Sequence, residues 1–442
     1  MECRFSLTPS PLLVLFACLS VPSALEAGEA VFPLRAAPDG RYFVDSAGRP
    51  FFYHADTGWT VTKKLVPKEV DEYLDDRRAR GFTAIHVHTF SKEQGPLANR
   101  DGQAPFEPPD DILKPNERYW QNVDSILRAA RSRNLLVAMA AIWIRWGGKD
   151  REGWRYQLTP DNARPYGRFL GTRYREFQNL IWILGGDANP IERSSAIAEI
   201  ALGIQESAPH QLISVHNRPE NSSASFFGSQ QWLGVNMAYT YGETYIHVLG
   251  EWNRLGKVWP IVLGESGYEE ESNDGRGGEP FRVRRQAYGA ILSGALGGHA
   301  FGQKHIWRFD EKWRGALDSP ATRHIAHVKK LFASRPWYRL IPDQESELVI
   351  DGRGFFGDVD YVPAARTADG GLAIVYVPQA RPVAVDLGRL RGPLRAEWFD
   401  PTTGEIVEVE GAPFEAAGPR KFAPPPKNAA GDTDFALVLE GR

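Results

Sequence analysis

From about residue 50 to residue 302, short and wholly apolar runs alternate with longer amphipathic stretches. Strands that are apolar along their whole length are typical of parallel sheets with both faces covered. Eight such runs, separated by helical stretches over roughly 250 residues, match the (β/α)8 barrel. The predicted strands are 51–55, 83–88, 135–142, 180–184, 212–216, 233–238, 261–264 and 298–302.

The stretches between these runs show helical spacing of apolar residues. The clearest begins at Pro67 and ends at Gly81, because proline is favoured in the first turn of a helix and glycine just after the last. Further helices are predicted at 117–134, 190–207, 283–296 and 319–340.

After residue 339 the pattern changes to short alternating segments separated by Gly, Pro, Asp and Thr turns, of which DPTTG at 400–404 is a clear hairpin turn. This pattern predicts a separate β-sandwich of about 100 residues. We therefore expect an α/β fold, with a (β/α)8 TIM barrel over residues 31–342 and a small C-terminal β-sandwich over residues 345–442.

The N-terminus is typical of a bacterial export signal, with an apolar core at 12–19 and small residues up to Ala27. The apolar core is too short to span a bilayer, so no transmembrane segment is predicted. We expect residues 1–27 to be a signal peptide of a secreted, periplasmic or envelope protein. A lipid anchor at Cys18 is the open alternative, since residues 15–18 resemble a lipoprotein cleavage box.

Charge and aromatic content narrow the class of partner that this protein is expected to bind. The 442 residues include 52 basic and 55 acidic side chains, and a net charge of −3 does not favour a nucleic-acid partner. The chain has 13 Trp, 15 Tyr and 23 Phe. Sugar rings present flat apolar C–H faces to such side chains, so a carbohydrate substrate fits this composition, although most aromatic residues are expected in the core.

Two strands end in a single acid. The runs 179–187 (NLIWILGGD) and 259–265 (WPIVLGE) each place one carboxylate after an apolar strand and glycine. Such a charge is costly to desolvate unless the site uses it. At the ends of the fourth and seventh barrel strands, Asp187 and Glu265 would face each other across a glycosidic bond. We expect Asp187 to protonate the departing oxygen and Glu265 to attack the anomeric carbon; the alternative for either acid is a helix cap.

Several further side chains are predicted to contact substrate. Asp56 follows the first strand and is predicted to bind sugar hydroxyls, with a turn cap or an arginine pair as the alternative. His86 and His88 share one face of a strand, and no third ligand at metal spacing and no HExxH motif is present, so hydrogen bonding is favoured over a metal site. The other candidates are Trp59, Trp143, Trp146, His216, Asn217, Tyr239, Tyr241, Gln303, His305 and Trp307.

The run 352–357 (GRGFFG) matches the dinucleotide fingerprint GxGxxG by letter. The fingerprint needs a helix directly after it to hold phosphate, and this run lies in β-rich sequence. We therefore predict no cofactor.

The chain resembles the apiosidase-like glycoside hydrolases, family 140, with their attached C-terminal domain labelled collagen-binding-like. The matching segments are 51–59 (FFYHADTGW), 81–85, 179–190 with GGDANP, 262–270 with GESGYE, 284–307 and 327–342. This chain has Ala188 where the family usually has a bulky residue. The resemblance implies an exo-acting enzyme on pectic side chains that releases apiose, with Asp187 and Glu265 as the catalytic pair.

Two other classes compete with this interpretation. A non-catalytic carbohydrate-binding barrel predicts that one of the two acids points into a salt bridge, away from the barrel mouth. An esterase or protease is disfavoured, because neither GxSxG nor HExxH is present.

Overall fold

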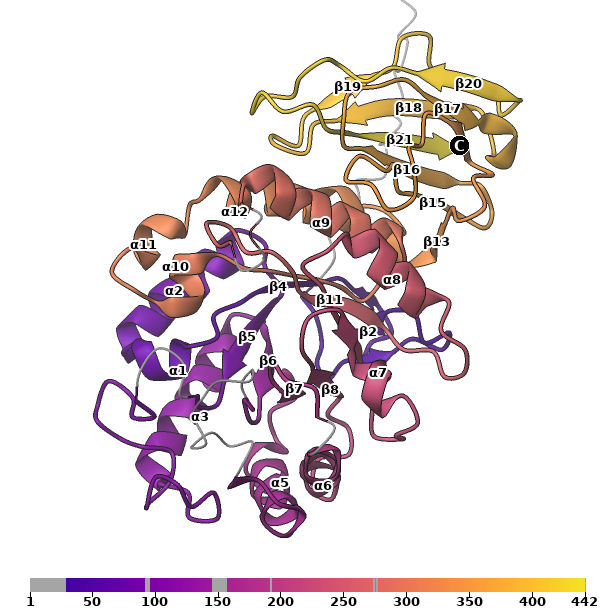
Figure 1. The fold of residues 1–442 in the computed structure, drawn as a ribbon. Helices are drawn as coiled ribbons and strands as arrows, with labels where there is room; N and C mark the ends of the chain where they lie inside the picture. The colour runs from indigo at the N-terminus through magenta and orange to yellow at the C-terminus, as the bar shows by residue number, and fades with distance from the viewer. Residues whose placement is uncertain are drawn as a thin grey trace, which may run out of the picture.

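The computed structural model describes residues 29–91, 96–144, 157–190, 193–272, 275 and 277–441. A barrel with outer helices is followed by a C-terminal β-domain that packs against one side of it (Figure 1). The predicted signal peptide over residues 1–27, Cys18 within it, and Trp146 lie outside the described residues.

The (β/α)8 prediction is confirmed. Neighbouring barrel strands pair in parallel in the order β8-β7-β6-β5-β4-β12-β11-β10, and the short β9 (Asn221–Ser222) adds antiparallel to β10. The hydroxyl of Ser223 closes the ring between β8 and β10, because it accepts from the backbone N–H groups of Val215 and Met237 and donates to the Val215 carbonyl. The barrel strands are β4 (Tyr53–Asp56), β5 (Ala84–His88), β6 (Leu136–Ala140), β7 (Leu180–Gly185), β8 (Ile213–His216), β10 (Asn236–Tyr239), β11 (Ile261–Glu265) and β12 (Gly298–Phe301).

Alternate strand residues face the barrel interior and the surrounding helices, as strand geometry requires. Tyr53, Ala84 and Ile181 belong to an inner cluster, whereas their strand neighbours pack outward. A small antiparallel sheet of β1 (Arg35–Ala36), β2 (Phe43–Val44) and β3 (Pro50–Phe51) adds two phenylalanines to this inner cluster. That sheet closes the amino-terminal end of the barrel and leaves the carboxyl end for the site.

The five helices predicted from the sequence are present as α2 (Pro67–Ala79), α3 (Glu117–Ser132), α6 (Ser194–Gln205), α9 (Pro280–Leu292) and α12 (Pro320–Ala333). None of the helices in the described part of the chain has the length and apolarity that a membrane crossing needs. The other α-helices of the described residues are α1 (Val61–Lys64), α5 (Pro160–Tyr174), α7 (Ser223–Phe227), α8 (Thr244–Trp252), α10 (Lys304–Arg308) and α11 (Trp313–Ala316).

The C-terminal domain is a sandwich of two antiparallel sheets, as predicted. A six-stranded sheet, β13-β15-β16-β21-β18-β19, faces a three-stranded sheet, β14-β17-β20, across a shared apolar core. The first strand, β13, begins at Leu340 and pairs with β15. The strands are β13 (Leu340–Pro342), β14 (Val349–Asp351), β15 (Ala364–Thr367), β16 (Leu372–Val377), β17 (Val383–Asp386), β18 (Leu394–Phe399), β19 (Ile406–Glu408), β20 (Pro419–Phe422) and β21 (Phe435–Gly441).

The two domains share a core. The outer face of the six-stranded sheet packs on α9 and α12 (Figure 1). Tyr288 of α9 stacks on Tyr376 of β16, with ring centroids 4.4 Å apart. The fully buried Arg284 donates to the carboxylate of Asp434, which also accepts from the Tyr376 hydroxyl. This apolar and ionic contact fixes the C-terminal domain against the barrel.

Candidate active site

Asp187 follows β7 on a sharply turned backbone. Gly185, Gly186 and Asp187 have φ angles of 83°, 122° and 45°, all in the left-handed region that glycine adopts most easily. A Cβ atom on Gly186 would lie 2.4 Å from the ring of Trp143. The glycine pair therefore turns the chain toward the barrel mouth and lets the indole lie against the backbone just before the acid.

Glu265 ends β11 and faces Asp187. One oxygen of each acid and one ring nitrogen of His216 lie within 4.8 Å of one another. The side chain of Asp187 is 25% exposed and that of Glu265 is 9% exposed. The structure thus brings together two acids that lie far apart in the chain, with one side open to solvent.

His216, at the end of β8, lies between the two acids. Its Nε2 is 3.0 Å from Oε2 of Glu265, and its Nδ1 is 3.1 Å from the Asn217 carbonyl oxygen and 3.7 Å from Oδ1 of Asp187. Both ring nitrogens face acceptors, so these partners favour the doubly protonated imidazolium. Burial by itself lowers the pKa of His216, but the hydrogen bond to Glu265 and the charges of Glu265 and Asp187 outweigh it, and the pKa is raised.

We expect His216→Asn to destabilise the protein more at about pH 6 than at about pH 9. Because the pKa of His216 is raised by folding, its imidazolium stabilises the folded chain below the unfolded pKa of about 6.5. This contribution is lost as the pH rises through the higher folded value. Melting temperatures of variant and wild type at both pH values measure the effect. The exposed His210, changed to Asn, is the control, and an equal penalty at both pH values for His216→Asn would contradict the assignment.

Two tyrosines of the β10 segment continue the network. The Tyr239 hydroxyl donates to that of Tyr241 at 2.8 Å, and the Tyr241 hydroxyl donates to Oε1 of Glu265 at 3.2 Å. Since His216 contacts Oε2, each of the two carboxylate oxygens of Glu265 has a hydrogen-bond donor. These contacts hold the carboxylate in one orientation.

Aromatic rings form the wall of the site beside the acids. Trp143 lies 4.8 Å from His216 and 4.3 Å from His88, measured between ring centroids. Trp59 packs against Trp143 at 5.0 Å, and its indole N–H donates to the hydroxyl of Tyr268 at 2.8 Å. The structure therefore brings together the predicted residues that follow β4 and β6 and those in β5 and β8.

Some buried polar atoms of this wall lack a protein partner. Both ring nitrogens of His88 and the amide oxygen of Asn217 have no hydrogen-bond partner among the described residues. A buried polar atom without a partner costs about 1–3 kcal/mol. Burial, with the nearby His216 and Lys63, keeps the pKa of His88 well below its ordinary value. A neutral imidazole both donates and accepts, which suits a hydroxyl partner.

His86 lies deeper on the same strand. Its Nε2 is 2.6 Å from the Tyr53 hydroxyl. Burial and the neighbouring His216 lower the pKa of His86 to about 3, so the ring is neutral. The contact with Tyr53 makes His86 a part of the site floor.

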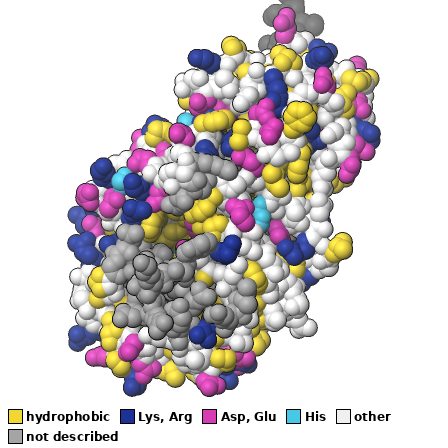
Figure 2. Space-filling view, in the orientation of Figure 1, with side chains coloured by type: hydrophobic (Ala, Val, Ile, Leu, Met, Phe, Trp, Pro, Cys, Tyr) yellow, Lys and Arg dark blue, Asp and Glu magenta, His cyan; other side chains and the backbone are white. Residues whose placement is uncertain are grey.

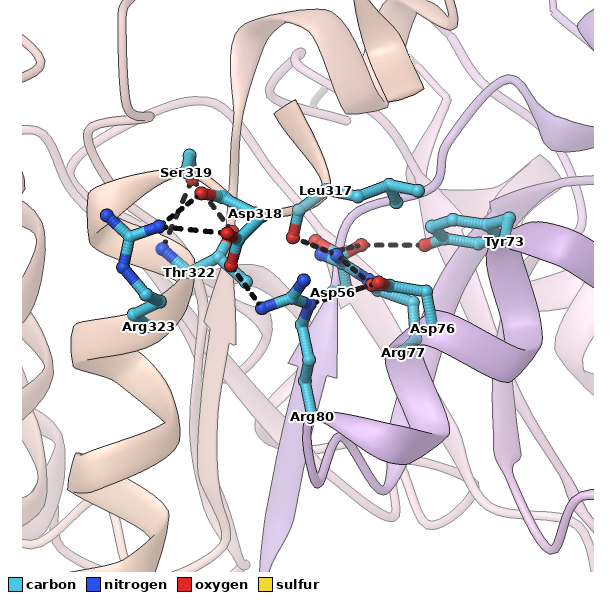
Figure 3. Close-up of polar contacts among 10 residues, drawn as sticks. All are labelled: Asp56, Tyr73, Asp76, Arg77, Arg80, Leu317, Asp318, Ser319, Thr322 and Arg323. Carbon is cyan, nitrogen blue, oxygen red and sulfur yellow. Dashed lines mark hydrogen bonds and ion pairs between the residues drawn. The ribbon is translucent and has the colours of Figure 1, made fainter. Parts of the chain in front are cut away.

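Asp56 does not contact the pocket, which corrects its prediction as a substrate ligand. It is fully buried and faces α2, where it accepts from the Tyr73 hydroxyl at 2.8 Å and lies 3.4 Å from a guanidinium nitrogen of Arg77 (Figure 3). The same guanidinium donates to the Leu317 carbonyl at 2.6 Å. Asp56 therefore pairs with an arginine, Arg77, which is the alternative that the sequence left open.

Three candidates near β12 have protein partners. The amide oxygen of Gln303 accepts from backbone N–H groups in the first turn of α10 and so caps that helix, while its buried amide nitrogen has no hydrogen-bond partner among the described residues. His305 pairs with two carboxylates. Trp307 donates to Glu271 at 3.0 Å, and its partly exposed ring packs on the inner cluster.

Two site residues were not among the sequence candidates, namely Tyr53 and Tyr268. Tyr53 is an inward-facing strand residue two positions before Ala55, so strand alternation would have indicated it. Tyr268 lies in the GESGYE segment, and its ring fills the space that a side chain at Gly302 would need. The glycine directly after β12 was the available signal.

Among the described residues, Asp187, His216 and Glu265 form one group whose atoms are close enough to share a metal ion. The imidazole of His216 does not suit that role, because a ligand nitrogen must be free of a proton and both of its nitrogens face acceptors. These three side chains suit proton transfer by the acids and ion pairing of both acids with the imidazole between them.

An (β/α)8 barrel with two facing carboxylates at the ends of its fourth and seventh strands, beside aromatic walls, has the features of a glycoside hydrolase. The comparison with family profiles is more specific. The profile described as “Apiosidase-like, catalytic domain” matches residues 37–339, so the chain belongs to the apiosidase-like family. The profile described as “Putative collagen-binding domain of a collagenase” matches residues 341–440.

Solved structures agree with this class. A structure named “Glycoside hydrolase” is 25% identical with a TM-score of 0.82, covering 92% of this chain and 96% of that chain. The crystal structure of a glycoside hydrolase family 5 from Bacteroides vulgatus ATCC 8482 is 24% identical with a TM-score of 0.82, covering 92% and 93%, and shows likeness of the fold. The comparison with curated proteins found no match. The predicted family resemblance and glycosidase class are confirmed.

Gly186→Ala should lower kcat/KM by about 100-fold, because displacing an active-site group by about 1 Å costs this much. The new methyl group would collide with the Trp143 ring, and the φ of 122° is strained for alanine. Hydrolysis kinetics measure the loss. Gly315→Ala is the matched control, since a Cβ there meets nothing within 4 Å. A Gly186→Ala variant as active as the control would show that the tight turn is not needed.

Proposed function

We propose that this protein is an exo-acting, retaining glycoside hydrolase of plant cell-wall pectic oligosaccharides, apiosidase-like in its substrate. The observation that carries the proposal is the pair Asp187 and Glu265, whose nearest oxygens lie within 4.8 Å over one pocket. Retaining pairs lie about 5–5.5 Å apart and inverting pairs about 6.5–9.5 Å apart. The short separation leaves no room for a water between Glu265 and the anomeric carbon, and so supports retention.

The surroundings of the two acids support their separate roles. Glu265 is the more buried acid and accepts hydrogen bonds from Tyr241 and His216, which suits a nucleophile that must stay aligned with the anomeric carbon. Asp187 is the more exposed acid, which suits a group that must reach the leaving group and then water. His216 acts as a positioning residue between them.

In the first step, Glu265 attacks the anomeric carbon while Asp187 gives its proton to the departing glycosidic oxygen. This breaks the glycosidic bond and forms an ester between sugar and enzyme. In the second step, Asp187 takes a proton from water as that water attacks the same carbon, and the ester breaks. Two displacements on one carbon leave its configuration unchanged. The proton taken from water restores the protonated form of Asp187 for the next cycle.

The exo mode and the pectic substrate rest on membership of the apiosidase-like family. Export to the periplasm, the envelope or the medium is part of the proposal and rests on the N-terminal sequence pattern. The competing idea of a non-catalytic binding barrel requires one acid to turn away into a salt bridge, and both acids here face His216 at the pocket.

The test is a screen of the purified protein against pectic, hemicellulosic and apiose-bearing oligosaccharides, with released monosaccharides identified by chromatography. We expect one sugar to be released from chain ends of a pectic side chain. Proton NMR of the first product then gives its anomeric configuration, which we expect to match the substrate. Release of the opposite anomer would refute retention, and no release from any substrate would refute the hydrolase proposal.

A further inference from the structure

A loop of the C-terminal domain, residues 352–361, is attached to the barrel. The ring of Tyr361 stacks on Tyr245 of α8 with centroids 4.6 Å apart, and the Tyr245 hydroxyl accepts from the Gly357 N–H at 2.6 Å. From α9, Arg285 donates to the Val359 carbonyl at 2.6 Å. The loop is therefore held by two barrel helices at once.

These contacts lie on the catalytic side of the barrel. The helices α8 and α9 follow the loops that leave β10 and β11, and helices of a (β/α)8 barrel begin at the end where the strands finish. Tyr245 is the second residue of α8, and Arg285 lies in the second turn of α9. The loop 352–361 thus borders the rim next to the strands that carry Tyr239 and Glu265.

A cavity of about 250 Å³ lies between this rim and the C-terminal domain. Arg282 lines this cavity and also donates to the backbone carbonyl of Tyr241 at 2.9 Å. The side chain of Arg282 therefore connects the cavity to the catalytic network. The hydroxyl of the same tyrosine donates to Glu265. The lining includes Glu243, Phe281, Arg282 and Arg285 of the barrel and Val359 and Gln379 of the C-terminal domain.

Exposed apolar side chains continue from the cavity over the loop. Phe355 is 82% exposed, Phe356 is 59% exposed and Val359 is 57% exposed. Figure 2 shows hydrophobic side chains gathered on the part of the C-terminal domain that borders the barrel. Val359 lines the cavity and Phe356 packs edge-to-face on Tyr245 and Tyr361, so the loop adds an exposed apolar patch of the kind that marks binding sites.

We infer that this cavity and the phenylalanines of loop 352–361 bind the neutral sugar units that remain on the leaving-group side of the substrate. The inference rests on the proposed function, since an exo enzyme places one sugar in the pocket and all others on the leaving-group side. Aromatic rings suit the apolar C–H faces of sugars. The cavity is smaller than the roughly 300–1,000 Å³ of sites for drug-sized ligands, which fits one sugar unit.

The charges of the lining favour a neutral sugar over a uronate. Arg285 pairs with Glu243 at 2.7 Å, and Arg282 and Glu279 add one charge of each sign. The lining thus has no net positive charge to attract a carboxylate. The amide of Gln379 offers hydrogen-bonding groups to hydroxyls.

The experiment compares two substrates of the released sugar, its 4-nitrophenyl glycoside and the oligosaccharide from the screen. We expect Phe355→Ala and Gln379→Ala each to lower the ratio of kcat/KM for the oligosaccharide to that for the 4-nitrophenyl glycoside by about fivefold to tenfold. Leu255→Ala is the matched control, since that leucine is 95% exposed in the loop before β11. Melting temperatures show that each variant is folded.

The possible outcomes distinguish failure of the leaving-group surface from failure of the proposed hydrolase function. A wild-type ratio in both variants, with hydrolysis intact, overturns the leaving-group surface and leaves the hydrolase proposal standing. An equal loss on both substrates overturns it as well, because the loop would then act on the catalytic pocket itself. If the wild type hydrolyses neither substrate, the proposed function fails and this inference fails with it.

Discussion

Replacing Glu265 with glutamine should lower kcat by about 10⁴-fold or more on every substrate that the wild type hydrolyses. The amide keeps the size of the side chain and cannot form the ester with the anomeric carbon. Asp187→Asn should lower kcat by about 10²–10⁴-fold, the usual range for a lost general acid and base. The matched control is Glu176→Gln, a surface acid that is 83% exposed, which should be fully active. Unchanged hydrolysis in both site variants would exclude the assignment of this pair.

Azide separates the two roles. In Glu265→Ala, azide can occupy the space of the missing carboxylate and attack directly, so the expected product is a glycosyl azide of inverted configuration. In Asp187→Ala the ester still forms from substrates with good leaving groups, and azide then attacks that ester to give a product of retained configuration. Measurement of product configuration by NMR checks both. The opposite pattern would exchange the roles of Asp187 and Glu265.

The barrel could be predicted from the sequence because its strands are buried on both faces and are therefore apolar throughout. The helix α5 was missed for a physical reason. It contains Pro165 and the glycines Gly167 and Gly171, which all disfavour a helix locally. A Cβ on Gly167 would lie 2.3 Å from the Ile200 carbonyl oxygen of α6, so close packing between the two helices outweighs their low propensity.

The error at Asp56 has a different origin. Ala55 faces the barrel interior, so strand alternation turns Asp56 outward, toward the helices. Its position at the end of a strand suggested substrate contact, while its direction excludes it. His216 is the opposite case, since its strand position was identified correctly. Its role between two acids depends on the relative positions of β7, β8 and β11, which spacing along the chain does not contain.

Arg77→Met should destabilise the folded protein by about 3–5 kcal/mol, because it leaves the carboxylate of Asp56 buried without its cation. The side chains of Arg77 and Asp56 are both 0% exposed. The neighbouring Arg78 provides the matched control, since its side chain is 37% exposed and lies 3.5 Å from Glu29 (Figure 3 shows the buried network around Arg77). Arg78→Met should cost less than about 1 kcal/mol.

Urea unfolding of both variants measures these differences, and a second substitution identifies their cause. Asp56→Asn added to Arg77→Met removes the unpaired charge while keeping an acceptor for the Tyr73 hydroxyl. The double variant should therefore be more stable than Arg77→Met alone, since replacing both members of a buried pair is far less costly than removing one. If the double variant is less stable than Arg77→Met, the loss comes from the contacts of the guanidinium with Asp76 and the Leu317 carbonyl, and the charge of Asp56 is not its cause.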